Sequence, residues 1–420
     1  MTVDPTKTAF LLLHWQNDLA MRGGKMAGNF PEILSSTRTI ERVQKALKAS
    51  REKGMMVIYI NLAYRPGYPE LPAKPAPFLA DVAKNAALIR ETWGSEVIDP
   101  LKPLQNDIVI SSSSPNGFSY TELDMILRYN GITDLVVTGL GTNWGVESTA
   151  REAAGKGYFS YILEDCCVAM SDDLHNWWIK YGLPATGKIS NSAQYVACLE
   201  RANPVPKRTF VPPPADLSTL DTARTALILL HMENDVVTTG GKMAGQFPER
   251  LAAAGNLDRI ETVLKASREK GIPVIYVVAG MRPGYPDMPG ALSPLAGLVV
   301  KMGAMVRGTW GAEINEKVKP LKGEVLIYNF GPSGFWHTDL DLILRSKGIK
   351  NVVLTGVATN FVVESTARDA AMLGYYFYVL KDCTNSLRDD LHNFSLTNIL
   401  PMLGAVTDSK TFIEALGKAR

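Results

Sequence analysis

Short apolar runs alternate with amphipathic stretches along the first half of the chain. The apolar runs predict buried strands at residues 9–14, 55–62, 107–112, 134–139, 158–163 and 186–190. Apolar positions at helical spacing predict helices at residues 35–54, 122–129, 144–157, 172–181 and 192–202. Continuous apolar strands separated by helices favour a mainly parallel sheet covered on both faces, a Rossmann-like three-layer α/β domain of about six strands.

The same pattern occurs again after a constant offset of 217 residues. His14 then matches His231, and Trp93 matches Trp310. A repeat of this length corresponds to a whole domain rather than to a solenoid unit. The sequence therefore predicts a tandem duplication, with one domain at residues 1–203, a Pro-rich linker at 204–220 and a second domain at 221–420.

Composition excludes several classes of function. The 44 basic and 42 acidic residues give a net charge of +2, which offers no strong field for nucleic acid or an anionic membrane. No apolar run is long enough to span a bilayer, and no signal peptide is expected. The four cysteines form no CxxC pair and do not indicate a disulfide framework, so a reducing cytoplasm is expected; they are Cys166, Cys167, Cys198 and Cys383.

The carboxyl ends of the predicted strands are the expected ligand edge, because ligands of such sheets bind there. His14 ends the first strand, and residues 111–118 and 141–146 follow two others. The proline-rich connection at 63–77 is either a lid or partner contact, or a passive surface loop.

Two blocks of sequence carry a family resemblance. LLLHWQNDLA and GFSYTELDMILRYNGITDLVVTGLGTNWGVESTAREAAGKGY in the first repeat correspond to LLHMENDVV and GFWHTDLDLILRSKGIKNVVLTGVATNFVVESTARDAAMLGY in the second. Both resemble the isochorismatase-like cysteine hydrolase superfamily, over nearly the whole of each repeat. The RPGYP and TWG segments are similar to those of a subgroup that includes amidohydrolases of small ureides.

The resemblance implies an Asp–Lys–Cys triad, in which the Cys attacks an amide carbonyl. All three positions differ here. The Asp position holds His14 and His231, the Lys position holds Ser112 and Asn329, and the Cys position holds Gly145 and Val362. Cysteine chemistry is therefore not expected, and Cys166 and Cys383 are interpreted as small buried residues. Isochorismatases of the superfamily also lack the Cys and cleave a vinyl ether, which implies a precedent for chemistry without it.

Histidine at the end of the first strand is the most informative feature of both repeats. An imidazole can take or give a proton near neutral pH, so His14 and His231 are the candidate general acid–base groups. Asp18 and Asp235 lie four residues further on and are expected to orient the rings. The alternative is a polar residue retained in a decayed site. Ser112 and His14 form a second candidate pair, with Ser112 as the nucleophile.

Replacing the triad by His, Ser and Gly predicts a roomier pocket in the first repeat. Aromatic walls would favour a planar ligand, although each of these side chains could equally be ordinary core. The candidate lining residues are Trp15, Trp93, Phe118, Tyr120, Asn143 and Trp144 in the first repeat, and Met232, Trp310, Phe335, Trp336 and Phe361 in the second, where Val362 fills space.

Three further groups of charged or polar residues have two interpretations each. Arg65 and Arg282 either bind a substrate carboxylate or are solvated lid charges. Lys25 and Lys242 either supply the charge of the missing triad lysine or have no part in the site. His175 and His392 follow acidic residues at a helix start, where capping is favoured over metal ligation. No metal site is expected, and the lack of GxGxxG after the first strand argues against a dinucleotide, so no cofactor is predicted.

Three hypotheses follow for the function. The first is an enzyme for a small planar or carboxylated metabolite that uses His14, and His231 as well, without a cysteine nucleophile; vinyl-ether hydrolysis, elimination, isomerisation and hydration all fit. The second is an amide hydrolase with Ser112 as nucleophile, and the third is an inactive binding or scaffold module. The resemblance further implies a pseudo-dimer within the chain and a homo-oligomer, such as a dimer of tandem chains.

Overall fold

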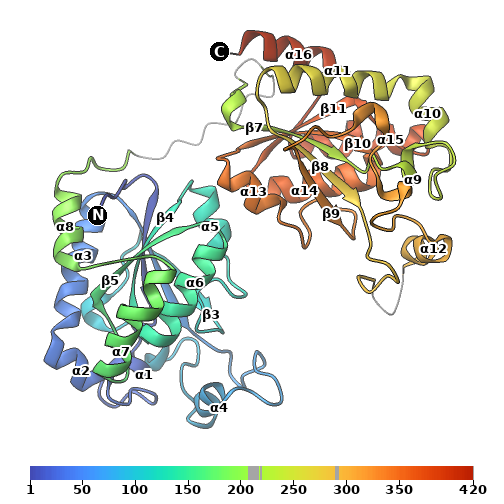
Figure 1. The fold of residues 1–420 in the computed structure, drawn as a ribbon. Helices are drawn as coiled ribbons and strands as arrows, with labels where there is room; N and C mark the ends of the chain where they lie inside the picture. The colour runs from blue at the N-terminus through green and yellow to red at the C-terminus, as the bar shows by residue number, and fades with distance from the viewer. Residues whose placement is uncertain (207–216, 218–219, 289–292, 420) are drawn as a thin grey trace. The chain divides into compact units, whose positions relative to one another are not determined.

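The computed structural model describes residues 1–206, 217, 220–288 and 293–419. Contacts divide the chain into two units, Met1–Thr209 and Phe210–Arg420. Each unit has one sheet of six parallel strands with helices on both faces, so the predicted fold class is confirmed (Figure 1). Most of the predicted linker, 204–220, lies outside the described residues.

The strands of the first unit follow the order β3-β2-β1-β4-β5-β6, and those of the second follow β12-β11-β10-β7-β8-β9. The first strands of the two repeats, β1 and β7, are therefore central. The strands are β1 (Thr8–Leu13), β2 (Met56–Leu62), β3 (Ile108–Ser112), β4 (Asp134–Leu140), β5 (Phe159–Val168), β6 (Lys188–Ser190), β7 (Thr225–Leu230), β8 (Val274–Ala279), β9 (Val325–Asn329), β10 (Asn351–Val357), β11 (Tyr376–Asn385) and β12 (Ala405–Thr407).

The helices connect the strands in the same sequence in both units. In the first unit they are α1 (Asn17–Ala20), α2 (Phe30–Thr37), α3 (Thr39–Glu52), α4 (Pro77–Lys84), α5 (Leu123–Tyr129), α6 (Glu147–Gly155), α7 (Asp172–Trp177) and α8 (Ser192–Glu200). In the second they are α9 (Asn234–Val237), α10 (Phe247–Ala254), α11 (Asn256–Glu269), α12 (Pro294–Met302), α13 (Leu340–Ser346), α14 (Glu364–Met372), α15 (Asp389–Phe394) and α16 (Ser409–Lys418).

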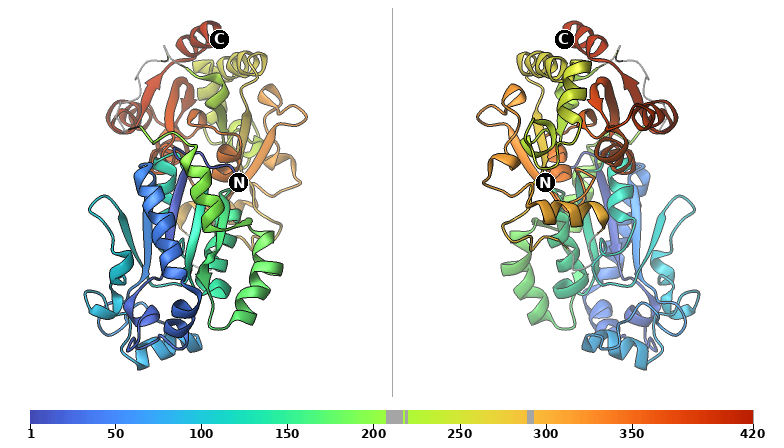
Figure 2. Two further views of the ribbon diagram at one scale, coloured as in Figure 1. Left: turned by 90° about the vertical axis from the view of Figure 1, so that its left-hand side faces the viewer. Right: turned by 90° about the vertical axis from the view of Figure 1, so that its right-hand side faces the viewer.

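Alternate residues of the central strand face the two helical layers. In the first unit Phe10 and Leu12 belong to the core under α3 and α8, which lie side by side (Figure 2). Leu11 and Leu13 belong to the core under α5 and α6. A strand covered on both faces must be apolar at every position, which explains the unbroken run in the sequence.

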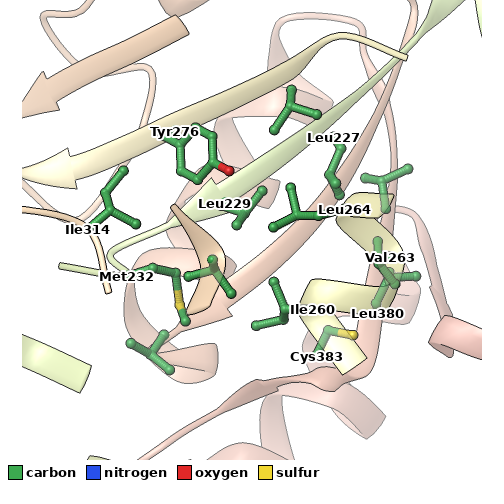
Figure 3. Close-up of a cluster of buried hydrophobic side chains, with 14 of the residues drawn as sticks. Leu227, Leu229, Met232, Ile260, Val263, Leu264, Tyr276, Ile314, Leu380 and Cys383 are labelled. Carbon is green, nitrogen blue, oxygen red and sulfur yellow. The ribbon is translucent and has the colours of Figure 1, made fainter. Parts of the chain in front are cut away.

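The second unit repeats this division. Leu227 and Leu229 of β7 meet Ile260 and Leu264 of α11, as the close-up shows (Figure 3). Cys383 of β11 lies in the same cluster of apolar side chains, which confirms that it is a small buried residue. Two well-filled cores fix the strand ends, and the strand ends carry the candidate site.

The predicted helix at 35–54 is wrong at its start. It is two helices, α2 and α3, separated at Arg38, whose backbone is left-handed with a φ of 52°. Gly255 has the corresponding conformation, with a φ of 64°, between α10 and α11. The connection at 63–77 leads directly into α4, a helix that the sequence analysis missed. No helix in the described part of the chain is both long and apolar enough to cross a bilayer.

Candidate functional site

The topology places the candidate site between the two central strands of each sheet. β1 pairs with β2 on one side and with β4 on the other, and the chain order changes direction between β1 and β4. Such a switch point opens a crevice at the carboxyl edge of the sheet, because the loops that follow the two strands leave in opposite directions. His14 follows β1 at this edge, and the helical turn that contains Gly145 follows β4.

His14 is held in one orientation by its backbone and by its ring. Its φ is 61°, and its backbone N–H donates to the carbonyl of Ile60 at 2.8 Å. The ring Nε2 lies 2.8 Å from the carbonyl oxygen of Pro115, which can only accept, so Nε2 carries the proton. Nδ1 is therefore an open lone pair, and it has no hydrogen-bond partner within the described residues.

Burial controls the protonation of this imidazole. The side chain of His14 is 3% exposed, and the loss of solvation lowers its pKa to about 4, although the hydrogen bonds with Pro115 and Ile60 act in the opposite direction. His14 is therefore neutral at pH 7. A neutral imidazole whose Nε2–H is already donated presents Nδ1 as its proton acceptor.

The ring of His14 occupies the space next to Gly145. A Cβ atom at Gly145 would lie 2.5 Å from Cδ2 and 2.7 Å from Nε2 of His14. The expectation of a roomier pocket at this position is therefore wrong, because the imidazole fills the space in front of the glycine. A cysteine at residue 145 is incompatible with the observed position of the ring.

The second repeat has a different set of contacts around the equivalent imidazole. His231 has a φ of 51°, and its Nε2 lies 2.9 Å from Oδ1 of Asn329. The amide nitrogen of Asn329 donates to the carbonyls of Gly331 at 2.7 Å and Ser333 at 3.1 Å, so Oδ1 is the atom that faces the ring. Burial lowers the pKa of His231 to about 4 as well.

A buried carboxyl group lies beside His231. Oε1 of Glu233 is 3.9 Å from Nδ1 of His231, and the Glu233 side chain is fully buried. The corresponding residue of the first repeat is Gln16, whose amide donates to the carbonyls of Leu62 and Ser95 and accepts from the Leu62 N–H. The sequence analysis missed this position, although the change from LLLHWQND to LLHMEND contains a visible signal, an acid in place of an amide.

A known family model matches both repeats of the chain. The isochorismatase domain model matches residues 8–194 and again residues 225–411. The chain belongs to the isochorismatase family. Its similarity to the family extends over most of each repeat, so both sheets and both candidate sites belong to the matched regions.

Individual family members match about half of the chain. The ureidoacrylate amidohydrolase RutB of Rhizobium rhizogenes is 30% identical over 240 residues, covering 54% of this chain and 96% of that protein. RutB of Caulobacter vibrioides (strain ATCC 19089 / CIP 103742 / CB 15) is 32% identical over 211 residues, covering 47% of this chain and 94% of that protein. Solved structures include an isochorismatase-like hydrolase from Alkaliphilus metalliredigens, at 28% identity, 46% and 98% coverage and a TM-score of 0.37. The N-carbamoylsarcosine amidase from Thermoplasma acidophilum has 26% identity, 44% and 96% coverage and a TM-score of 0.36.

The two aspartates expected to orient the imidazoles have another role in this family member. Asp18 accepts hydrogen bonds from the backbone N–H groups of Lys25 at 3.1 Å and Leu88 at 2.7 Å. Asp235 accepts the equivalent pair, at 3.0 and 2.7 Å. The prediction that they orient His14 and His231 is wrong, because both carboxylate oxygens are used to join two loops.

Ser112 does not form the predicted pair with His14. Its hydroxyl is buried and donates to the carbonyl of Ser114 at 2.7 Å, while it accepts the Ser114 N–H at 3.1 Å. The nearest polar contact of the His14 ring is instead the carbonyl of Pro115, from the same loop. The serine side chain therefore shapes the loop that holds the histidine.

Lys25 and the two lid arginines have partners in the loops around the site. Nζ of Lys25 donates to the carbonyl of Ala86, and Lys242 donates to the carbonyl of Gly303 at 2.6 Å. Arg65 pairs with Glu70 at 2.8 Å, and Arg282 pairs with Asp287. Their roles as substitutes for the triad lysine or as carboxylate-binding groups stay predictions.

The predicted aromatic walls divide into core and surface. Trp15, Phe118 and Phe335 are buried members of the hydrophobic clusters, which favours the alternative that they are ordinary core, and Val362 is buried in agreement with its expected space-filling role. Tyr120 is 97% exposed, and partly exposed aromatic rings include Trp93, Trp144, Trp310, Trp336 and Phe361. Trp144 is packed against Phe78 of α4, with ring centroids 4.5 Å apart. Met232 is also core, and Asn143 is partly buried.

His175 and His392 each make a side-chain contact with a threonine. Nδ1 of His175 lies 2.9 Å from the hydroxyl of Thr142, and His392 makes the same contact with Thr359 at 2.8 Å. The described residues contain no group of three or more side chains that could hold a metal ion. A cavity of about 100 Å³ lies between α2, α3, β5 and α7 and includes His175 but not His14 in its lining.

Proposed function

We propose that this chain is an isochorismatase-family enzyme that acts on a small planar or carboxylated molecule without a cysteine nucleophile. His14, and His231 in the second repeat, move the proton. One observation supports the proposal most: both repeats hold a buried, neutral imidazole at the switch point. In each ring Nε2–H donates a hydrogen bond, so Nδ1 is the atom that can accept a proton. A family site that had merely decayed would have no reason to keep the same tautomer in both repeats.

The tautomer favours particular chemistry. A neutral imidazole begins a cycle by accepting a proton at Nδ1 and returns it in a later step. This sequence suits the activation of water in hydrolysis or hydration, and the removal of a proton in isomerisation or elimination. The relatives named for ureidoacrylate, a small molecule with a carboxylate, support a substrate of that size and charge.

The residues at the expected nucleophile position and the burial of three thiols support chemistry without a cysteine nucleophile. Gly145 and Val362 stand at the nucleophile position. Burial raises the pKa of the Cys167 thiol to about 12 and also raises the pKa values of Cys166 and Cys383, so these three thiols stay protonated at pH 7. This protonation state supports a mechanism that is independent of cysteine.

Two other functions remain as alternatives to the proposal. An amide hydrolase would use Ser112, but its hydroxyl is hydrogen-bonded within the loop, and the second repeat has Asn329 in its place. A binding module is favoured by the small exposure of both rings, 3% for His14 and 9% for His231. The experiment below separates the three.

The test uses isochorismate and ureidoacrylate as probes of the two bond types in the family. Asparagine tolerates the left-handed backbone of both histidines, so His14→Asn and His231→Asn keep the fold. The expected result is turnover that survives alkylation with iodoacetamide and falls about 10²-fold or more in at least one variant. Loss of turnover on alkylation with an intact circular dichroism spectrum overturns the proposal. So does full activity in both histidine variants, while loss in Ser112→Ala alone identifies the amide hydrolase, and saturable binding of a probe without turnover identifies the binding module.

We also propose a cytoplasmic location and a homo-oligomer built from tandem chains. The four free cysteines support a reducing compartment. Analytical ultracentrifugation of the purified chain tests the assembly, and a monomer at micromolar concentration contradicts it.

A further inference from the structure

Glu233 is a buried ionisable group beside His231 that the proposed function does not use. It is fully buried, and neither carboxyl oxygen has a hydrogen-bond partner within residues 220–288, 293–419 or the rest of the described chain. Burying an unpaired carboxyl group is costly. Its position immediately after His231 and Met232 calls for a physical explanation.

The first repeat shows what this position normally contacts. Gln16 uses its amide nitrogen to donate to two carbonyls, those of Leu62 at 2.6 Å and Ser95 at 2.9 Å, and uses its oxygen to accept the Leu62 N–H at 2.7 Å. A carboxylate can only accept, so in the same surroundings it would meet carbonyl oxygens with no proton to offer. A protonated carboxyl group keeps one donor.

The electrostatic surroundings agree with a protonated acid. Burial raises the pKa of Glu233 to about 8, and the charge of Asp235 on α9 raises it as well. The backbone amides of Glu233 and Ala279 act in the opposite direction, although neither makes a hydrogen bond of normal geometry with the carboxyl group. His231, at the end of β7, is the other titratable group that faces it.

His231 offers this proton a place to go. Because its Nε2–H donates to Asn329, the basic atom of the neutral ring is Nδ1, and that atom faces Oε1 of Glu233 at 3.9 Å. A shift of roughly 1 Å would bring the pair to hydrogen-bonding distance. The carboxyl O–H bond then breaks, the Nδ1–H bond forms, and the neutral pair becomes a carboxylate and an imidazolium with no net change in charge.

We propose that Glu233 and His231 share one proton, so that the second repeat contains an acid-competent centre while the first contains a base. Glu233 is a positioning residue here: it acts through His231 and supplies the charge that an imidazolium needs. In the first repeat the amide of Gln16 has no acidic proton that it could transfer to a ring, and Nδ1 of His14 has no partner among the described residues. The proton sharing stands by itself, whereas its use in catalysis rests on the proposed function.

The chain provides a reciprocal pair of variants for the test. Glu233→Gln restores in the second repeat the amide that the first already has, so it is expected to fold. Gln16→Glu places the acid beside His14. The measurement is the pH dependence of the ring ¹⁵N resonances of His14 and His231 in the full chain between pH 5 and 9.

The expected result is a coupled titration, in which the ring resonances of His231 shift as Glu233 loses the shared proton near pH 8, while those of His14 do not. In Glu233→Gln this shift disappears and His231 behaves like His14. In Gln16→Glu, the resonances of His14 acquire it. The proposal is overturned if His231 and His14 titrate alike in the unmodified chain, or if Glu233→Gln leaves the resonances of His231 unchanged.

Activity separates this proposal from the proposed function. Where turnover of a probe is found, Glu233→Gln is expected to lower kcat more than KM, and to remove the limb of the pH profile near pH 8. A change in the ring resonances without any change in turnover leaves the proton-sharing pair in place and removes its catalytic role. If neither repeat turns over a probe, the proposed function is overturned, but the proton shared by Glu233 and His231 is not.

Discussion

Adding one methyl group at Gly145 is expected to destabilise the first unit. Non-bonded carbon atoms normally lie about 3.5–4.0 Å apart. The new Cβ would lie 2.5 Å from Cδ2 and 2.7 Å from Nε2 of His14. The ring cannot turn away without loss, because Nε2 donates to Pro115 and the backbone of His14 is bonded to Ile60.

Two opposing contributions determine the size of the effect. Forcing a methyl group into a filled site costs about 1–3 kcal/mol. Replacing glycine by alanine in a helical turn contributes about 0.5–1 kcal/mol of stability in the absence of a clash. The clash is the larger contribution, so Gly145→Ala is expected to lower the free energy of unfolding by about 1–2 kcal/mol. For a unit of this size that corresponds to a fall in Tm of about 2–8 °C.

The assay is urea and thermal unfolding of the full chain followed by circular dichroism, in which the transition of one unit should move. Gly155→Ala is the matched control, because its Cβ would meet no atom of the described residues within 4 Å, and it is expected to be neutral or stabilising. In a His14→Ala background the cost of Gly145→Ala should disappear, giving a coupling of about 1–2 kcal/mol. Unchanged stability in Gly145→Ala, or an equal cost with and without the ring, refutes the reasoning.

Three further predictions follow from the buried polar groups and thiols. Asp18→Asn should cost about 1–3 kcal/mol in urea unfolding, because one amide oxygen cannot accept both loop N–H groups, and Asp235→Asn should cost the same; a neutral result in either contradicts the loop-joining role. Because burial raises the pKa of Glu233 from 4.5 to about 8, its contribution to stability is complete below pH 4.5 and is lost as the pH rises through about 8. The free energy of unfolding of Glu233→Gln should therefore rise relative to that of the unmodified chain as the pH increases from 5 to 8. Parallel curves of unfolding free energy against pH would contradict this. A disulfide reagent at pH 8 should label Cys198 rapidly and the three buried cysteines only after unfolding; fast labelling of more than one thiol would show that the buried set is accessible.

The strands of the sheet could be predicted from the sequence because their residues form unbroken apolar runs. A central strand buried on both faces must be apolar throughout, so residues 9–14 and 134–139 predicted β1 and β4 to within one or two residues. The break between α2 and α3 could not be read from the first repeat, where Arg38 takes the left-handed conformation. The second repeat has Gly255 at that position, a common signal of a helix end, and comparing the repeats would have found it.

The candidate site could be predicted only in part. Strand ends identify His14 and His231, since topology alone brings those ends to one edge. Contacts between side chains depend on loop paths, which periodicity does not encode. Asp18 is four residues from His14 but binds Leu88, from a distant loop. Phe118 follows a strand as a pocket residue would, yet it stacks on Tyr158 in the core, with centroids 5.7 Å apart.

The two repeats differ at the site in a way that links their substitutions. In the first, the short side chain of Ser112 is bonded within its own loop, so the imidazole donates to Pro115 and fills the space in front of Gly145. In the second, the longer Asn329 supplies an acceptor for His231, and the position of Gly145 is taken by a buried valine.

The turns that carry Gly145 and Val362 also begin differently, at Gly141 with a φ of 76° in the first repeat and at Ala358 with a φ of −91° in the second. Ser112 or Asn329, at the end of the third strand of its sheet, thus differs between the repeats together with the residue in that turn, Gly145 or Val362. Nδ1 of His231 faces Glu233, whereas Nδ1 of His14 has no partner among the described residues. The two sites thus differ in three features together: the acceptor of Nε2 is a backbone carbonyl or a side-chain amide, the turn holds a glycine or a valine, and Nδ1 has no partner among the described residues or faces a buried acid.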